Sequence, residues 1–197
     1  MQLLVATQNA GKKQEYAELL DELKAEIVFP DHLRLGLDVE EDGTTYAQNA
    51  RKKGREYHMA SELLTVADDS GLEVDALSGA PGLHSARYVQ GTDADRVAAL
   101  LEALADVPWA DRTARFRCVI AVVTQRGCVT EFEGICEGVI AFEPQGEGGF
   151  GYDPIFYLPD RGRTMAELPR RVKNRISHRA RAVERALPTL AKLLEDG

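Results

Sequence analysis

The sequence has few cysteines and no long apolar segment. Cys118, Cys128 and Cys136 are an odd number of cysteines without a C-x-x-C pair, which argues against disulfides and zinc and favours thiols in the core. No apolar run approaches the roughly 18 residues that a membrane-spanning helix needs. The start, residues 1–5, is too short and lacks the basic residues of a secretory signal. We therefore expect a cytoplasmic protein without a membrane partner.

The sequence also has fewer basic than acidic residues, and its formal net charge is −8. This balance argues against a general binder of nucleic-acid polymers. The segment 160–185 departs from it, with nine lysines and arginines against three acidic residues. A basic segment of this kind in an acidic protein suits a small polyanion, although a solvated helix surface would explain the same charges.

The chain of 197 residues is long enough for one large domain or for two lobes that share a core. With 44% apolar and 28% charged residues it has an ordinary globular composition. Hydrophobic periodicity and turn residues predict the following elements: strands at 2–6 and 27–29, helices beginning near residues 12, 46 and 93, a hairpin of 115–124 with 128–142, and a last helix from 177. We expect Thr45 and Gln48 to form a capping box and Pro188 to kink or interrupt the last helix.

Two adjacent carboxylates, Asp68 and Asp69, lie between apolar residues that include Val66 and Leu72. At about 4 Å two such charges repel by roughly 1 kcal/mol in water and by several times more near a protein surface. A divalent cation, a proton on one acid or a solvated turn would each relieve this repulsion. Since adjacent strand residues point to opposite faces, we expect the two acids to have different roles.

A polar turn, residues 7–12, connects the first strand to the first helix. The free N–H groups and the positive end of a helix dipole favour anions at such a turn, and a bound phosphate would explain Lys12 there. The pattern lacks the spacing of a P-loop. An ordinary strand-to-helix turn is the alternative.

Other polar and aromatic residues would also suit a ligand that contains phosphate. Glu41 lies in an acidic loop, Lys53 follows Asn49 by one helical turn, and Phe150 stands among glycines. Mg²⁺ takes one or two carboxylates together with phosphate oxygens, and an aromatic ring can stack on a base. Together these residues predict a site for a magnesium nucleotide.

With these features, the sequence resembles the inosine/xanthosine triphosphate pyrophosphatase family of non-standard purine NTP pyrophosphatases. The resemblance rests on five motifs in order: T-x-N-x-G-K at 7–12, A-D-D-S-G at 67–71, G-A-P-G-x-x-S-A-R-Y at 79–88, G-G-F-G-Y-D-P at 148–154 and K-N-x-I-S-H-R at 173–179. It implies an α/β fold, elongated and two-lobed, with a mixed sheet and a central nucleotide-binding cleft, formed by residues 1–197 as one domain. It also implies a homodimer and Mg²⁺-dependent hydrolysis of ITP, dITP or XTP to the monophosphate and pyrophosphate.

The resemblance also assigns roles to individual residues. Glu41 and Asp69 resemble metal ligands. Asp69 also resembles the acceptor of the proton from the attacking water, with Asp68 in support. Lys53 resembles a group that reaches the phosphates from the other lobe. Residues that would contact the substrate are Thr7, Asn9, Lys12, Ser70, Phe150, Gly151, Tyr152, Asp153, Lys173, His178 and Arg179. Phe150 would stack on the purine, and Arg179 would face the 6-oxo group. One departure is Val172, where the resemblance leads us to expect an acidic residue before Lys173.

A donor at the 6-oxo group would discriminate against ATP, since an unpaired buried donor costs roughly 1–3 kcal/mol. Two other functions remain open. The chain could be a sensor that binds nucleotide without turnover, or a related pyrophosphatase for other modified nucleotides. The retention of Glu41, Lys53 and Asp69 weighs against a sensor, and the S-H-R and F-G-Y-D segments favour a 6-oxopurine.

Overall fold

The computed structural model describes residues 1–195, which fold into a mixed sheet with helices. The strands are β1 (Gln2–Val5), β2 (Glu26–Val28), β3 (Leu64–Val74), β4 (Thr113–Val123), β5 (Val129–Ile140), β6 (Phe156–Leu158) and β7 (Arg163–Thr164). The α-helices are α1 (Ala10–Leu19), α2 (Tyr46–Ser61), α3 (Asp93–Ala103), α4 (Arg170–Ile176) and α5 (His178–Glu195). None of these helices is both long and apolar enough to cross a membrane.

The strands within the described range follow the order β2-β1-β3-β4-β5-β6-β7. Strand β1 pairs in parallel with β2 and β3, whereas β6 pairs antiparallel with β5 and β7. The predicted α/β class with a mixed sheet is therefore confirmed.

Contacts divide the chain into two compact units. Unit 1 consists of 1–69, 118–134 and 179–197, of which the last two residues lie outside the described part, and unit 2 consists of 70–117 and 135–178. The prediction of one domain over 1–197 stays a prediction.

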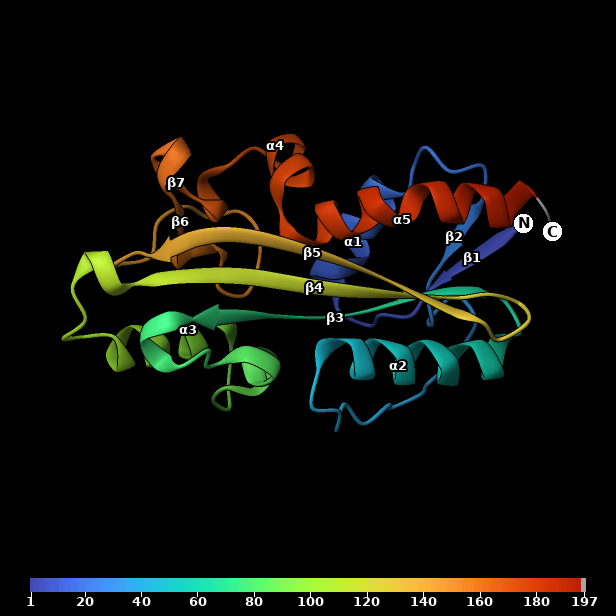
Figure 1. Ribbon diagram of the computed structural model, residues 1–197, viewed down its shortest axis with the longest axis horizontal. Coiled ribbons are helices and arrows are strands. Elements are labelled where there is room, and N and C mark those ends of the chain that lie inside the picture. Colours follow the sequence, from blue (N-terminus) through green and yellow to red (C-terminus); the bar gives the residue numbers. More distant parts are fainter. Residues whose placement is uncertain (196–197) are drawn as a thin grey trace. The chain divides into compact units, whose positions relative to one another are not determined.

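In unit 1, helix α2 lies on one side of β1 and β3, and α1 and α5 lie on the other side (Figure 1). Alternation along β1 explains the two layers, because Leu3 and Val5 pack with α1 and α5 while Leu4 packs with Tyr57 of α2. Unit 2 has its own core, in which Leu100 of α3 packs with residues of β3 to β6.

Several local expectations need correction. Thr45 caps α2 by accepting a hydrogen bond from Gln48 N (3.2 Å), but the Gln48 side chain accepts from Thr44 N instead of completing the box. Helix α5 continues through Pro188, so the helix is not interrupted there, and a kink at this residue stays a prediction. The packing of its apolar face, including Leu190, in the core of unit 1 outweighs the lost hydrogen bond.

The cysteine prediction is correct in part. All three cysteines are free thiols, and Cys118 and Cys136 are buried as expected, but Cys128 is exposed. It lies in the turn between β4 and β5, where its N–H donates to Thr124 Oγ1 (3.2 Å).

Candidate functional site

The predicted site residues divide between the two units. Unit 1 holds Thr7, Asn9, Lys12, Glu41, Lys53, Asp68, Asp69 and Arg179. Unit 2 holds Ser70, Phe150, Gly151, Tyr152, Asp153, Lys173 and His178.

The turn after β1 leads into the start of α1 as the sequence predicts. Asn9 is the residue before the helix, and its Oδ1 accepts a hydrogen bond from Lys12 N (2.9 Å), which fixes where the helix begins. Asn9 N in turn donates to Thr7 Oγ1 (3.3 Å). Helix α1 therefore begins at a defined turn, where an anion would be stabilised. Direct contacts of Thr7 and Asn9 with phosphate stay predictions.

Asp68 is the centre of a buried ion network in unit 1. Its Oδ2 lies 2.9 Å from Lys12 Nζ and 3.2 Å from Arg179 Nη2, and Arg179 Nη1 donates to Glu15 Oε2 at 2.5 Å. Burial alone would raise the pKa of Asp68, but Lys12, Arg179 and Lys53 outweigh it and hold this pKa well below its usual range. Asp68 is therefore ionised, and two cations balance two carboxylates.

The partners of Asp68 converge on one of its two oxygens. Cys118 Sγ lies 3.8 Å from Oδ2, and burial raises the pKa of this thiol, so it stays protonated and can donate. Asp68 Oδ1 has no hydrogen-bond partner within residues 1–195, and the same is true of the Tyr16 hydroxyl. Buried polar atoms of this kind are rare in folded proteins and indicate a place for water or a ligand group.

Asp69 has different partners on the opposite face of β3. Asn49 of α2 donates to Asp69 Oδ2 (2.9 Å), and the Asn49 oxygen accepts from Gly43 N (2.7 Å). Burial, and after it the nearby Glu41 carboxylate, raise the pKa of Asp69 above its usual range. Glu41 itself pairs with Lys53 Nζ at 2.5 Å. Asp69 is therefore held in place but electrostatically strained.

Charged side chains of both signs gather around Asp68 and Asp69 in unit 1. Lys12, Lys53 and Arg179 lie near four carboxylates, namely Glu15, Glu41, Asp68 and Asp69. Within residues 1–195 no three side chains of His, Cys, Asp or Glu are grouped as a complete metal site. Glu41 and Asp69 offer two carboxylates, a donor set that suits Mg²⁺ better than zinc, and their role as metal ligands stays a prediction.

In unit 2 the loop of Phe150 is held by Asp153. Asp153 Oδ2 accepts from Phe150 N (2.9 Å) and pairs with Lys173 Nζ, which also lies 4.9 Å from the centre of the Phe150 ring. Lys173 is thus oriented by Asp153 although Val172 precedes it. The structure brings these three predicted residues together.

The other predicted residues of unit 2 have separate surroundings. The Tyr152 hydroxyl is buried and donates to Ser85 O (3.0 Å), and the His178 ring stacks on Phe116 with ring centres 4.7 Å apart. Gly151 lies in the Phe150 loop with φ +62°, and Ser70 is a partly exposed residue of β3. Their contacts with a base stay predictions.

Two predicted residues have surroundings that the sequence did not indicate. Lys53 lies in the same compact unit as Lys12, and its reach to the phosphates from another lobe stays a prediction. Arg179 was expected in the base pocket, but its Nε, Nη1 and Nη2 donate to Asp68 and Glu15 in unit 1, and its side chain is only 1% exposed. Burial of an arginine requires such carboxylate partners, which explains the position.

Sequence reasoning missed some of these partners. Glu15 stands three residues after Lys12 and so on the same side of α1, which is a signal that could have been read. Cys118 and Ser85 carry no such local signal, because their contacts depend on strands and loops far along the chain. The Ser85 hydroxyl accepts from Leu72 N (2.8 Å) and donates to Gly82 O (2.6 Å).

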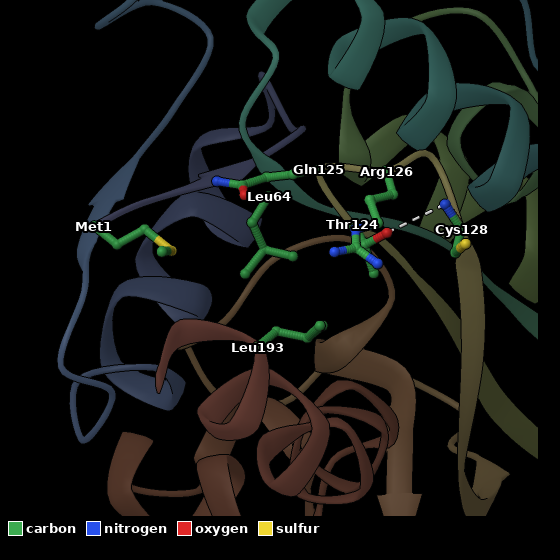
Figure 2. A pocket seen from close by; sticks show the side chains of 7 residues that line it. All are labelled: Met1, Leu64, Thr124, Gln125, Arg126, Cys128 and Leu193. Atoms are coloured by element: carbon green, nitrogen blue, oxygen red, sulfur yellow. Dashed lines mark hydrogen bonds between the residues drawn. The ribbon is translucent and has the colours of Figure 1, made fainter. Parts of the chain in front are cut away.

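Unit 1 also contains a cavity of about 380 Å³, whose lining residues are drawn in Figure 2. Its lining consists of Met1, Leu64, Thr124, Gln125, Arg126, Cys128 and Leu193. Leu64 begins β3, whereas Asp68 and Asp69 follow further along the strand. The lining contains no carboxylate and none of the predicted site residues.

Comparison with known proteins agrees with the arrangement of motifs. A sequence model of the Ham1 family matches residues 3–189. A protein named dITP/XTP pyrophosphatase from Desulforamulus reducens is 49% identical over 195 residues, which cover 98% of this chain and 97% of that protein.

Solved structures show the same relationship. A HAM1 protein from Coxiella burnetii is 41% identical with a TM-score of 0.85 over 100% of both chains. A structure named nucleoside-triphosphatase / dITP/XTP pyrophosphatase from Mycobacterium abscessus is 42% identical with a TM-score of 0.75, over 95% of this chain and 100% of that one. The resemblance inferred from the motifs is confirmed, and the chain belongs to the Ham1 family.

Proposed function

We propose that this chain is a nucleoside triphosphate pyrophosphohydrolase that converts the non-standard purine nucleotides ITP, dITP and XTP to the monophosphate and pyrophosphate. The observation that carries this proposal is Asp69, a buried carboxylate that Asn49 holds in a defined position, close enough to Glu41 for the two charges to interact. A general base needs such a defined position. The names of the relatives support the substrate class.

Mg²⁺ is the cofactor we propose, held by Glu41 and Asp69. When bound it would neutralise phosphate charge and lower the pKa of a water molecule. The chain's own residues supply the remaining steps.

As the oxygen of the attacking water bonds to phosphorus, Asp69 would accept a proton from this water. The bridging P–O bond breaks, and pyrophosphate leaves. Lys12 and Lys53 would stabilise the negative charge on the phosphate oxygens. Both ammonium groups are already held by carboxylates, Lys12 by Asp68 and Lys53 by Glu41, so little reorganisation is needed when phosphate arrives.

The residues of unit 2 would recognise the base. Phe150 offers an aromatic face, and Lys173 and Asp153 place a donor and an acceptor beside it. We also propose that the substrate contacts Ser70, Tyr152 and His178. Arg179 facing the 6-oxo group also remains a proposal, and its contacts with Asp68 and Glu15 support a role in holding Asp68.

A pyrophosphate-release assay with Mg²⁺ tests the function. Its substrates are ITP, XTP, dITP, GTP, ATP and dTTP, and we expect ITP, XTP and dITP to react fastest. Equal rates with ITP and ATP would remove the selectivity for a 6-oxopurine. Nucleotide binding without release of pyrophosphate would instead favour a sensor.

The homodimer implied by the resemblance and the expected cytoplasmic location stay predictions. Sedimentation of the purified protein would decide the first, and fractionation of the source cells the second.

A further inference from the structure

The loop that carries Phe150 depends on two glycines. Gly149 and Gly151 flank Phe150 with φ of +75° and +62°, values that favour glycine. A Cβ on Gly149 would also collide with the Asp153 carboxylate. A loop with two glycines has many accessible conformations when unrestrained, so contacts from outside it are needed to keep one.

One such contact comes from the start of helix α3. Asp93 is the first residue of this helix, and its Oδ2 accepts a hydrogen bond from Gly151 N at 2.7 Å. Arg96, one turn later, donates from Nη2 to Asp93 Oδ1 (2.6 Å) and from Nη1 to Gly91 O (2.9 Å). The Asp93 side chain is therefore fixed on both oxygens, although 49% of it is exposed.

We propose that Asp93 is a positioning residue for Phe150, and that it thereby sets how tightly the purine base binds. Gly151 N belongs to the peptide that also contains the Phe150 carbonyl, and this peptide is a rigid plane. Fixing its N–H limits rotation of the backbone at Phe150 and so the direction of the ring. The inference rests on the proposed stacking of Phe150 on the base.

Asp93 works from a different element than the other contacts of the loop. Asp153 holds Phe150 N from within the loop, and Tyr152 ties it to Ser85. None of the residues predicted from the sequence to bind substrate lies in α3. Loss of Asp93 should therefore loosen Phe150 and leave the residues of unit 1 unchanged.

The test compares Asp93→Ala with Asp95→Ala in the full chain. Asp95 is a matched control, because it lies on the same helical turn and accepts from Thr92 N (2.7 Å), but has no contact with the Phe150 loop among its hydrogen bonds. We expect Asp93→Ala to raise the KM for ITP about tenfold, the size of effect seen when a hydrogen bond to a charged group is lost, with kcat changed less than about threefold. Asp95→Ala should lower Tm with little change in KM. An equal rise of KM in both variants would overturn the proposal, because the helix start and not the Asp93 carboxylate would then be responsible.

Inorganic tripolyphosphate separates binding of the base from binding of the phosphates. As an inhibitor it lacks a base, so its inhibition constant should be the same in Asp93→Ala and in the unchanged protein. A parallel rise of this constant would overturn the proposal. Asp93→Asn keeps an acceptor oxygen for Gly151 N, so its KM for ITP should stay close to that of the unchanged protein. This variant provides a test even if Asp93→Ala folds poorly. A KM for Asp93→Asn as high as that of Phe150→Ala would contradict the positioning role of Asp93.

Phe150→Ala distinguishes this inference from the proposed function. If Phe150→Ala leaves KM unchanged, the proposed stacking is wrong and the inference falls with it. If Phe150→Ala raises KM but Asp93→Ala does not, only the inference is overturned. In the double variant the two effects should not add, because Asp93 acts through Phe150.

Discussion

Asp68 and Asp69, neighbours in strand β3, direct their carboxylates to opposite faces of the sheet. Asp68 contacts Lys12 of α1 and Arg179 of α5, whereas Asp69 contacts Asn49 of α2. Alternation along a strand explains this separation. The pKa of Asp68 is consequently lowered by its cations, while burial and Glu41 raise that of Asp69. One acid is thus anchored, and the other is suited to accept a proton.

Asp69→Asn should lower kcat by about 10²–10⁴-fold, because the amide has no basic oxygen for the water proton. The side chain keeps its shape, so ITP binding should change little. Steady-state rates and calorimetric titration with ITP measure the two effects. A kcat near that of the unchanged protein would show that Asp69 is not the base.

Asn49→Ala should lower kcat about tenfold, since Asp69 loses the hydrogen bond that orients it. The Gly43 N–H, which is only partly exposed, would also lose its acceptor, so a lower Tm is expected. Gln48→Ala is the control, because Gln48 lies on the same helix as Asn49 and its side chain accepts from Thr44, just before the helix. If both variants lose the same activity, the effect comes from the start of α2 and not from Asp69.

Arg179→Met should destabilise the fold by about 3–5 kcal/mol, because it removes the guanidinium that pairs with the buried carboxylates of Asp68 and Glu15. Urea unfolding followed by circular dichroism gives the free energy of unfolding. The exposed Arg181 provides the comparison, and Arg181→Met should stay within about 0.5 kcal/mol. Similar losses for both variants would mean that the ion network contributes little.

Mg²⁺ should raise Tm by binding the folded state, and Glu41→Gln should weaken that rise by removing a carboxylate ligand. EDTA should abolish pyrophosphate release and restore the lower Tm. The stability readout does not depend on turnover. An unchanged Mg²⁺-induced shift in Glu41→Gln would exclude Glu41 as a ligand.

Asp75→Asn should make the acid limb of the stability curve shallower. The hydrogen bond from Thr113, and after it those from Arg115, lower the pKa of Asp75. A carboxyl group whose pKa is lowered in the folded state stabilises the protein above about pH 4. This stabilisation is lost as the pH falls through the pKa of the folded state. Because Asp75 is partly exposed, the variant should lose about 0.5 kcal/mol near pH 7 and nothing near pH 2. Thermal melts from pH 2 to 7 measure the difference, and a loss that persists at pH 2 would show that it is not electrostatic.

The sequence by itself determined the family, the strand-to-helix turn after β1 and the opposite orientation of Asp68 and Asp69. These features depend on motif order, on a local turn and on the two-residue period of a strand, all of which are readable along the chain. Only the tertiary structure decided which partners each carboxylate has. Arg179 lies 111 residues from Asp68 and 164 from Glu15, so no local pattern relates them. Burial of an arginine beside β3 made it a partner of carboxylates, and packing in the core kept α5 helical through Pro188 against its local preference.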